Sequence, residues 1–73
     1  MPGSVYKVIE LVGTSAESWE DAALSALKTA AASLEDLRIA EVVKQDIRIE
    51  ENEIVEYRVK MKFSFKYHSE LAD

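Results

Sequence analysis

The chain has 73 residues, of which 48% are hydrophobic, and its 9 basic and 14 acidic side chains give a formal net charge of −5. This length predicts a single domain, residues 1–73, and such a short chain buries only about 60% of the surface exposed by its unfolded form. There is no cysteine and His68 is the only histidine, so disulfides and the usual zinc sites are excluded. The acidic balance argues against a nucleic-acid partner.

No stretch is long and apolar enough to cross a membrane, and the first residues lack the charged-then-apolar order of a signal peptide. We therefore expect a cytoplasmic protein with no membrane partner. The ordered core is expected at about residues 4–67, with a short tail at each end.

Residues 5–12, VYKVIELV, predict the first strand. They are rich in branched and aromatic side chains, and Lys7 and Glu10 are the only charges. This composition is typical of a strand with most of both faces covered. Gly13 then predicts a tight change of direction.

A helix is expected from Trp19 to about Leu34. Ser15 and Ser18 are candidate N-caps, and the sequence Ser18-Trp-Glu-Asp has the form of a capping box. The apolar residues of the helix recur at a helical period, at positions 19, 23, 26, 27, 30 and 34.

Most of that stripe is alanine, so the helix can approach a sheet closely, with Leu27 and Leu34 filling the gaps. Trp19 could serve as a ligand platform, but at the first helical position it is favoured to pack against one end of the sheet.

Two long strands follow. Residues 38–50 alternate imperfectly, because Ile39, Val43, Ile47 and Ile49 share one parity with the polar Glu41 and Gln45. Residues 50–53 form a polar turn, which predicts an antiparallel hairpin. Residues 54–67 alternate cleanly: one face holds Val59, Met61, Phe63, Phe65 and Tyr67, and the other holds Arg58, Lys60, Lys62, Ser64 and Lys66.

The predicted fold class is α+β, in the order β-α-β-β, with a three-stranded antiparallel sheet wrapped around one helix. Strands of about a dozen residues exceed the usual five to six. A helix of some fifteen residues spans only about 22 Å, so parts of the hairpin would overhang with unpaired edges. Self-assembly would bury those edges.

The basic stripe Arg58, Lys60, Lys62 and Lys66 admits two interpretations. A solvated or subunit-facing sheet surface is favoured, because acidic residues are available to neutralise it: Glu10, Glu41, Asp46 and Glu56. The alternative, that some of these bases meet a phosphate-bearing ligand, stays open.

The acidic residues also admit two interpretations. Glu17, Glu20 and Asp21 lie at the start of the helix, where acids favour the helix dipole whatever the function. No cluster has the spacing of a twelve-residue calcium loop. A symmetric assembly can nevertheless collect carboxylates from several chains, and such sites suit calcium or magnesium.

Catalysis finds little support in the sequence. There is no cysteine, no plausible set of serine, histidine and acid, and no glycine-rich phosphate loop, since Gly3 and Gly13 are the only glycines. We expect a protein that is not an enzyme.

Four motifs, in order and at matching spacing, resemble the dodecin family from Val5 to about Tyr67: VYKVIELVGTS, SAESWEDA, AEVVKQ and YRVKMKFSFK. The resemblance implies a non-enzymatic, hollow homododecamer of β-α-β-β subunits. Many members of this family bind and store flavins as stacked pairs.

Two positions depart from the flavin-binding members. Ile39 stands where the resemblance implies a tryptophan stacked on the flavin ring, and isoleucine offers no π face. Arg58 stands where it implies a glutamine bound to the polar edge of the ring, and arginine donates hydrogen bonds but accepts none. Ile39 and Arg58 therefore predict weakened or lost flavin stacking. Alternatively, Ile39 is an ordinary strand residue and Arg58 forms an inter-subunit ion pair.

The absence of the stacking aromatic resembles the branch of the family for which calcium association is proposed. Glu17 matches a helix-start acid that gathers near a three-fold axis in some dodecins, which makes it the candidate metal-facing carboxylate.

Three hypotheses follow: a dodecin-like assembly that buffers a cation or serves structurally, a flavin store with an altered pocket, and an enzyme subunit with an inter-chain site. The residues at 39 and 58 favour the first.

Overall fold

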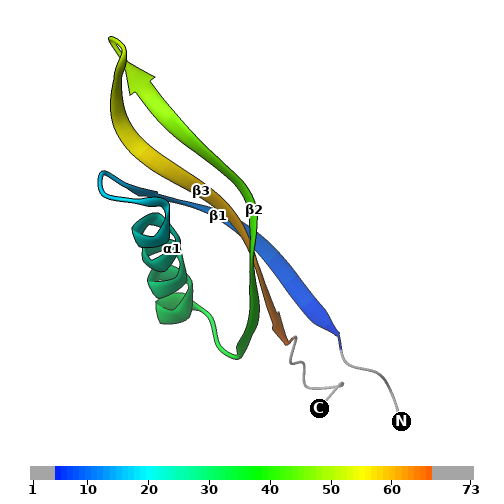
Figure 1. The fold of residues 1–73 in the computed structure, drawn as a ribbon. Helices are drawn as coiled ribbons and strands as arrows, with labels where there is room; N and C mark the ends of the chain where they lie inside the picture. Colours follow the sequence, from blue (N-terminus) through cyan, green and yellow to red (C-terminus); the bar gives the residue numbers. More distant parts are fainter. Residues whose placement is uncertain (1–4, 67–73) are drawn as a thin grey trace.

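The computed structural model describes residues 5–66, which form three strands and one helix (Figure 1). Strand β1 spans Tyr6–Ser15, helix α1 spans Trp19–Ser33, and strands β2 and β3 span Leu37–Glu50 and Glu53–Lys66. The sheet is antiparallel with the order β1-β3-β2, and α1 covers one of its faces. The predicted β-α-β-β fold is confirmed. Tyr67 and His68 lie outside the described residues.

The two faces of the sheet differ in chemistry. On the central strand β3, Val59, Met61 and Phe63 are buried, and they form the core with three helix residues: Ala22, Ala26 and Ala30. Side chains alternate along a strand, so Arg58, Lys60 and Lys62 lie on the opposite side, which we call the helix-free face. The alternation predicted for residues 58–63 is confirmed.

Gly13 does not turn the chain. It lies inside β1, opposite Val59, and its φ angle is not positive. A Cβ atom at this position would lie 2.1 Å from the carbonyl oxygen of Ala22 and 3.0 Å from the Cβ of Ala26. Glycine is therefore needed for the close approach of α1. The predicted change of direction was wrong, and β1 continues to Ser15.

Ser18 is the N-cap of α1. Its side chain accepts a hydrogen bond of 3.0 Å from the backbone N–H of Asp21. The other candidate, Ser15, accepts from the N–H of Glu17 at 2.9 Å and donates to the carboxylate of Asp21 at 2.7 Å. The capping box is thus incomplete, because the Asp21 carboxylate accepts a hydrogen bond from the Ser15 hydroxyl and not from the backbone N–H of Ser18.

The buried stripe of α1 is narrower than predicted. Ala22, Ala26 and Ala30 are buried, whereas Ala23 is partly buried and Leu27 is 37% exposed. Ala22, which lay outside the predicted stripe, is fully buried, and its backbone carbonyl faces Gly13. Leu34, partly buried, is the C-cap.

Irregularities in β2 explain its imperfect alternation. The register shifts between Leu37 and Ile39 and between Val42 and Lys44, where β2 has one extra residue each time; at a third shift, between Arg48 and Ile49, the extra residue is in β3. A β-bulge adds one residue to one strand and so exchanges the faces of the residues beyond it. Ile39 and Ile47 therefore lie opposite Ser64 and Tyr57, on different faces, although they share one parity in the sequence.

The hairpin of β2 and β3 extends beyond β1 and α1 (Figure 1). Pairing with β1 ends at Ser15 and Tyr57, so the last residues of the hairpin have no third strand. The turn places Glu51 and Asn52 at φ angles of 51° and 65°, as a type I′ turn requires. The predicted overhang is confirmed.

A single chain leaves much apolar surface uncovered. Val8 and Val12 of β1 are 51% and 56% exposed, so the prediction that both faces of this strand are covered is wrong for one chain. The radius of gyration is 15.4 Å, against about 11 Å for a compact chain of this length.

Candidate functional site

Ile39 and Arg58, the two predicted ligand positions, both lie on the helix-free face. Ile39 is opposite Ser64 and Arg58 is opposite Asp46. Ser64 lies six positions beyond Arg58 along β3, which corresponds to about 20 Å. A small ligand cannot touch both side chains of one chain, so a site that contains both must combine different chains.

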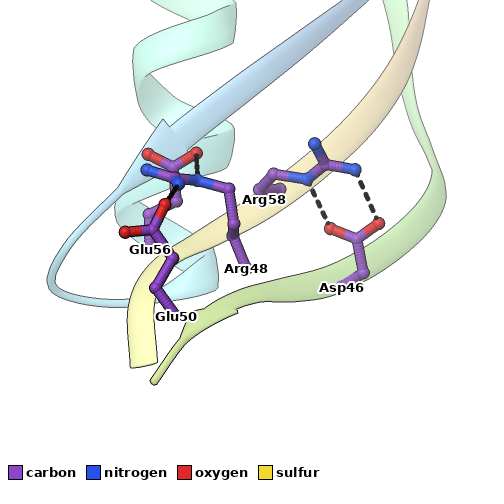
Figure 2. A network of polar contacts seen from close by, with 5 residues as sticks. All are labelled: Asp46, Arg48, Glu50, Glu56 and Arg58. Atoms are coloured by element: carbon purple, nitrogen blue, oxygen red, sulfur yellow. Dashed lines mark hydrogen bonds and ion pairs between the residues drawn. The ribbon is translucent and has the colours of Figure 1, made fainter. Parts of the chain in front are cut away.

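Arg58 is held by a carboxylate of the neighbouring strand (Figure 2). Its Nε donates to Asp46 Oδ1 at 2.7 Å, and its second nitrogen, Nη2, donates to Oδ2 at 3.0 Å. This paired geometry is the strongest that arginine and a carboxylate form. These two hydrogen bonds lower the pKa of Asp46 and raise the pKa of Arg58, because they favour the charged form of each group.

Arg58 therefore has an ion-pair partner within its own chain, and the alternative of an inter-subunit pair is not needed to neutralise it. The side chain is nevertheless 44% exposed, and that of Asp46 is 34% exposed. The pair is open to solvent and to any molecule that approaches the helix-free face.

The other predicted charge pairs are realised in part. Lys60 and Lys62 lie 3.4 Å and 4.0 Å from the carboxylate of Glu10 on β1. Glu56 pairs with Arg48 at 3.1 Å, and Arg48 also pairs with Glu50 (Figure 2). Arg48 was not part of the predicted basic stripe, so the ion pair of Glu56 lies outside it, although the charge of Glu56 also contributes to the raised pKa of Arg58.

A hollow of about 230 Å³ lies on the helix-free face beside Arg58. Its lining consists of Val12, Lys44, Asp46, Arg58 and Lys60. Three cations and one carboxylate thus surround a small space, and strands β1, β2 and β3 all contribute. Lys44 was not singled out from the sequence, because the bulge at Val42 and Lys44 decides which face it joins.

Trp19 connects α1 to the strand that carries Asp46. Its ring makes an edge-on contact with Tyr57 at 5.3 Å between centroids, and its Nε1–H donates to the carbonyl oxygen of Asp46 at 3.1 Å. The indole is partly buried, and its N–H is bonded to the backbone. Trp19 therefore packs against the sheet, as predicted. It also fixes the backbone at the position of Asp46.

Ile39 is 61% exposed and so offers an apolar surface to a ligand or to another chain. Glu17 is exposed in the loop between β1 and α1, and its N–H is held by Ser15. Within one chain, residues 5–66 contain no group of three Asp, Glu, His or Cys side chains that could hold a metal ion. Nor do these residues include a helix that could cross a membrane.

Comparison with known proteins gives a consistent result. Residues 5–68 match the sequence pattern of the dodecin family. The chain is 46% identical over 63 residues to a calcium dodecin from Mycobacterium tuberculosis, covering 86% of this chain and 89% of that protein.

Solved structures agree with this. Dodecin from Streptomyces coelicolor superposes with a TM-score of 0.86 at 29% identity, covering 94% of this chain and 99% of that one. A calcium-chelating antigen of Mycobacterium tuberculosis, calcium dodecin, described as having a novel calcium-binding site, superposes with a TM-score of 0.81. Its identity is 43%, and the match covers 92% of this chain and 96% of that one.

Proposed function

Because the chain belongs to the dodecin family, whose members are non-enzymatic binding proteins, we propose that it is a homododecameric storage or buffering shell with weakened flavin stacking and a bound cation. The observation that carries the weakened flavin stacking is the ion pair of Arg58, whose guanidinium group donates two hydrogen bonds to Asp46. The protein is a binding protein and not an enzyme.

Arg58 is a poor substitute for glutamine at a flavin edge for two reasons. It cannot accept a hydrogen bond from the ring N–H. To donate to the ring, it would also have to weaken two hydrogen bonds of 2.7 and 3.0 Å to Asp46. Both reasons lower the expected affinity for flavin.

Ile39 supports the same proposal. It is 61% exposed, so it presents surface for a ligand, but it lacks the π face of the aromatic residue implied at this position. A stacked aromatic contact contributes about 0.5–1.5 kcal/mol beyond burial, and a stacked flavin pair would use it on both sides.

Cation binding is supported by the similarity to calcium dodecin and by the acidic composition. Calcium takes six to eight oxygen ligands, and one chain supplies no suitable group of side chains among residues 5–66. The carboxylates would have to come from several chains, and exposed Glu17, in the loop before α1, is our candidate ligand for calcium or magnesium.

A flavin store with an altered pocket is the second candidate. Arg58 lines the hollow on the helix-free face and could contact a flavin oxygen or phosphate there, while Ile39 of another chain packs on the ring.

A flavin titration separates the two candidates. The double variant Ile39→Trp with Arg58→Gln should bind riboflavin at least about tenfold more tightly than the wild-type protein, because it gains a stacking ring and an acceptor. Quenching of flavin fluorescence measures both affinities. The pair Ile39→Val with Arg58→Lys is the control, since it adds neither a ring nor an acceptor. A wild-type protein that already binds riboflavin as tightly as the double variant would instead support the altered flavin store.

A further inference from the structure

Two like charges stand directly opposite each other on the helix-free face. Lys44 of β2 is paired in register with Lys60 of β3. Residues in this relation have Cβ atoms about 4.5–5.5 Å apart, and like charges so placed destabilise a sheet. The whole chain is acidic, with a net charge of −5, so a generally basic composition does not explain this pair.

The carboxylates near this pair are already engaged. Asp46 accepts two hydrogen bonds from Arg58, and Glu10 is shared between Lys60 and Lys62. Lys44 forms no ion pair of 4.0 Å or less with a carboxylate of residues 5–66, although its charge contributes to the lowered pKa of Asp46. An anion from outside the chain would offset the repulsion between the two lysines that Asp46 and Glu10, which have other partners, leave in place.

The hollow between these side chains has room for such an anion. Its lining of Lys44, Arg58, Lys60, Asp46 and Val12 has a net charge of +2, from three cations and one carboxylate. Its volume of about 230 Å³ is below the roughly 300–1,000 Å³ of pockets that enclose a drug-sized ligand. A small anion, or one charged group of a larger molecule, is the appropriate size.

We propose that this hollow binds a phosphate group, held between Lys44 and Lys60, with Arg58 at its edge. Lysine is a common phosphate ligand, and a phosphate oxygen can accept from each ammonium group in turn. The group could be free phosphate or the terminal phosphate of a nucleotide-like cofactor. This site is distinct from the proposed cation site, and it needs no aromatic residue at position 39.

Calorimetric titration of the full chain with inorganic phosphate at low ionic strength tests the site. Lys44→Gln and Lys60→Gln should each weaken binding by about tenfold or more, because each removes a charged hydrogen-bond donor. Lys28→Gln, an equal loss of charge on the exposed side of α1, is the matched control and should leave the affinity unchanged. Asp46→Asn should strengthen binding several-fold, because it removes a negative charge and releases Arg58.

Absence of saturable phosphate binding by the wild-type protein would overturn the proposal. So would equal weakening by Lys28→Gln, which would indicate a general effect of charge. Circular dichroism and native mass of each variant show that a loss of binding is not a loss of folding or assembly.

A second titration identifies the source of the phosphate. Tighter binding of flavin mononucleotide than of riboflavin, abolished by Lys44→Gln, would assign the site to the phosphate of a cofactor. Equal affinity for both flavins, with inorganic phosphate still bound, would assign it to the free anion. The riboflavin and calcium measurements do not involve Lys44, so failure here leaves the proposed function standing.

Discussion

At the scale of single residues, Gly13 and the three buried alanines of α1 determine how closely the helix approaches the sheet. Gly13 lies beneath the carbonyl oxygen of Ala22, and Ala26 lies next to it. All these positions have the smallest available side chains, so the backbones of α1 and β1 come nearly into contact. The core is thin, and Val59 and Phe63 are its largest fully buried side chains.

Gly13→Ala should therefore destabilise the protein strongly. The new Cβ would lie 2.1 Å from a backbone oxygen, which cannot move unless α1 moves as a whole. Overpacking of a well-packed core typically costs about 1–3 kcal/mol, and we expect a loss of at least this size in the free energy of unfolding. Urea denaturation followed by circular dichroism measures it.

Thr14→Ala is the control for this experiment, because Thr14 is the next residue of β1 and is exposed. It should change the free energy of unfolding far less. If Gly13→Ala were as stable as the wild-type protein, the close approach of β1 and α1 would be incorrect.

At the scale of elements, the ion pair of Arg58 and Asp46 joins β2 to β3 beside the point where β1 ends. Trp19 contacts the same region from the other face, through Tyr57 and the carbonyl oxygen of Asp46. One short segment of the hairpin is thus held from both sides of the sheet, and the residues beyond it have only each other.

The stabilising effect of Asp46 should depend on pH. Its pKa is lower in the folded protein than the usual value, mainly because Arg58 donates hydrogen bonds to the carboxylate. A depressed carboxyl pKa favours folding above the unfolded pKa, about 3.9, and this contribution is lost as the pH falls through the folded pKa. The melting temperature of the wild-type protein should exceed that of Asp46→Asn at pH 7, and the difference should shrink below about pH 4.

Thermal melts of the two proteins between pH 3 and pH 7 measure this difference. Glu41→Gln removes a carboxylate of β2 that lies opposite Lys62, outside the pair, and is the matched control. A difference between wild type and Asp46→Asn that stays constant over the whole range would contradict the assigned role of Arg58.

At the scale of the whole molecule, the isolated chain is elongated, and it leaves sheet edges unpaired and apolar side chains exposed. Strands β1 and β2 are both edges of the sheet, and the exposed apolar side chains lie on all its elements. At the end of the hairpin, Ile49 and Ile54 are opposite each other and are 60% and 57% exposed. Exposed edges and apolar surface of this extent are typical of a chain that associates with copies of itself.

We expect native mass spectrometry of protein purified without added ligand to find an assembly of about 98 kDa, twelve times the chain mass of 8.2 kDa. The mass should show no flavin, and added calcium should bind. Glu17→Gln should reduce calcium binding without changing the mass of the assembly, and Glu51→Gln in the hairpin turn is a control of equal charge change. A monomer or dimer would contradict the proposed shell, and retained flavin would favour the altered flavin store.

In the candidate site, the partners of Arg58 and Lys60 could not be predicted by counting residues from the hairpin turn. Counted back from the two-residue turn at Glu51 and Asn52, Arg58 would lie opposite Gln45. The register shift between Arg48 and Ile49 moves Asp46 to that place, and the same shift brings Lys44 opposite Lys60 in place of Val43. No local pattern in the sequence marks this irregularity, so neither the ion pair nor the lysine pair could be predicted.

The sequence by itself determined the order of elements, the N-cap at Ser18 and the buried face of β3, because these depend on local preferences and on a two-residue period. The tertiary structure decided the role of Gly13, the choice of Ala22 over Leu27 for burial, and the partner of Arg58. These three depend on the distance between elements and on the register of distant strands, which the chain acquires only when α1 and the hairpin pack together.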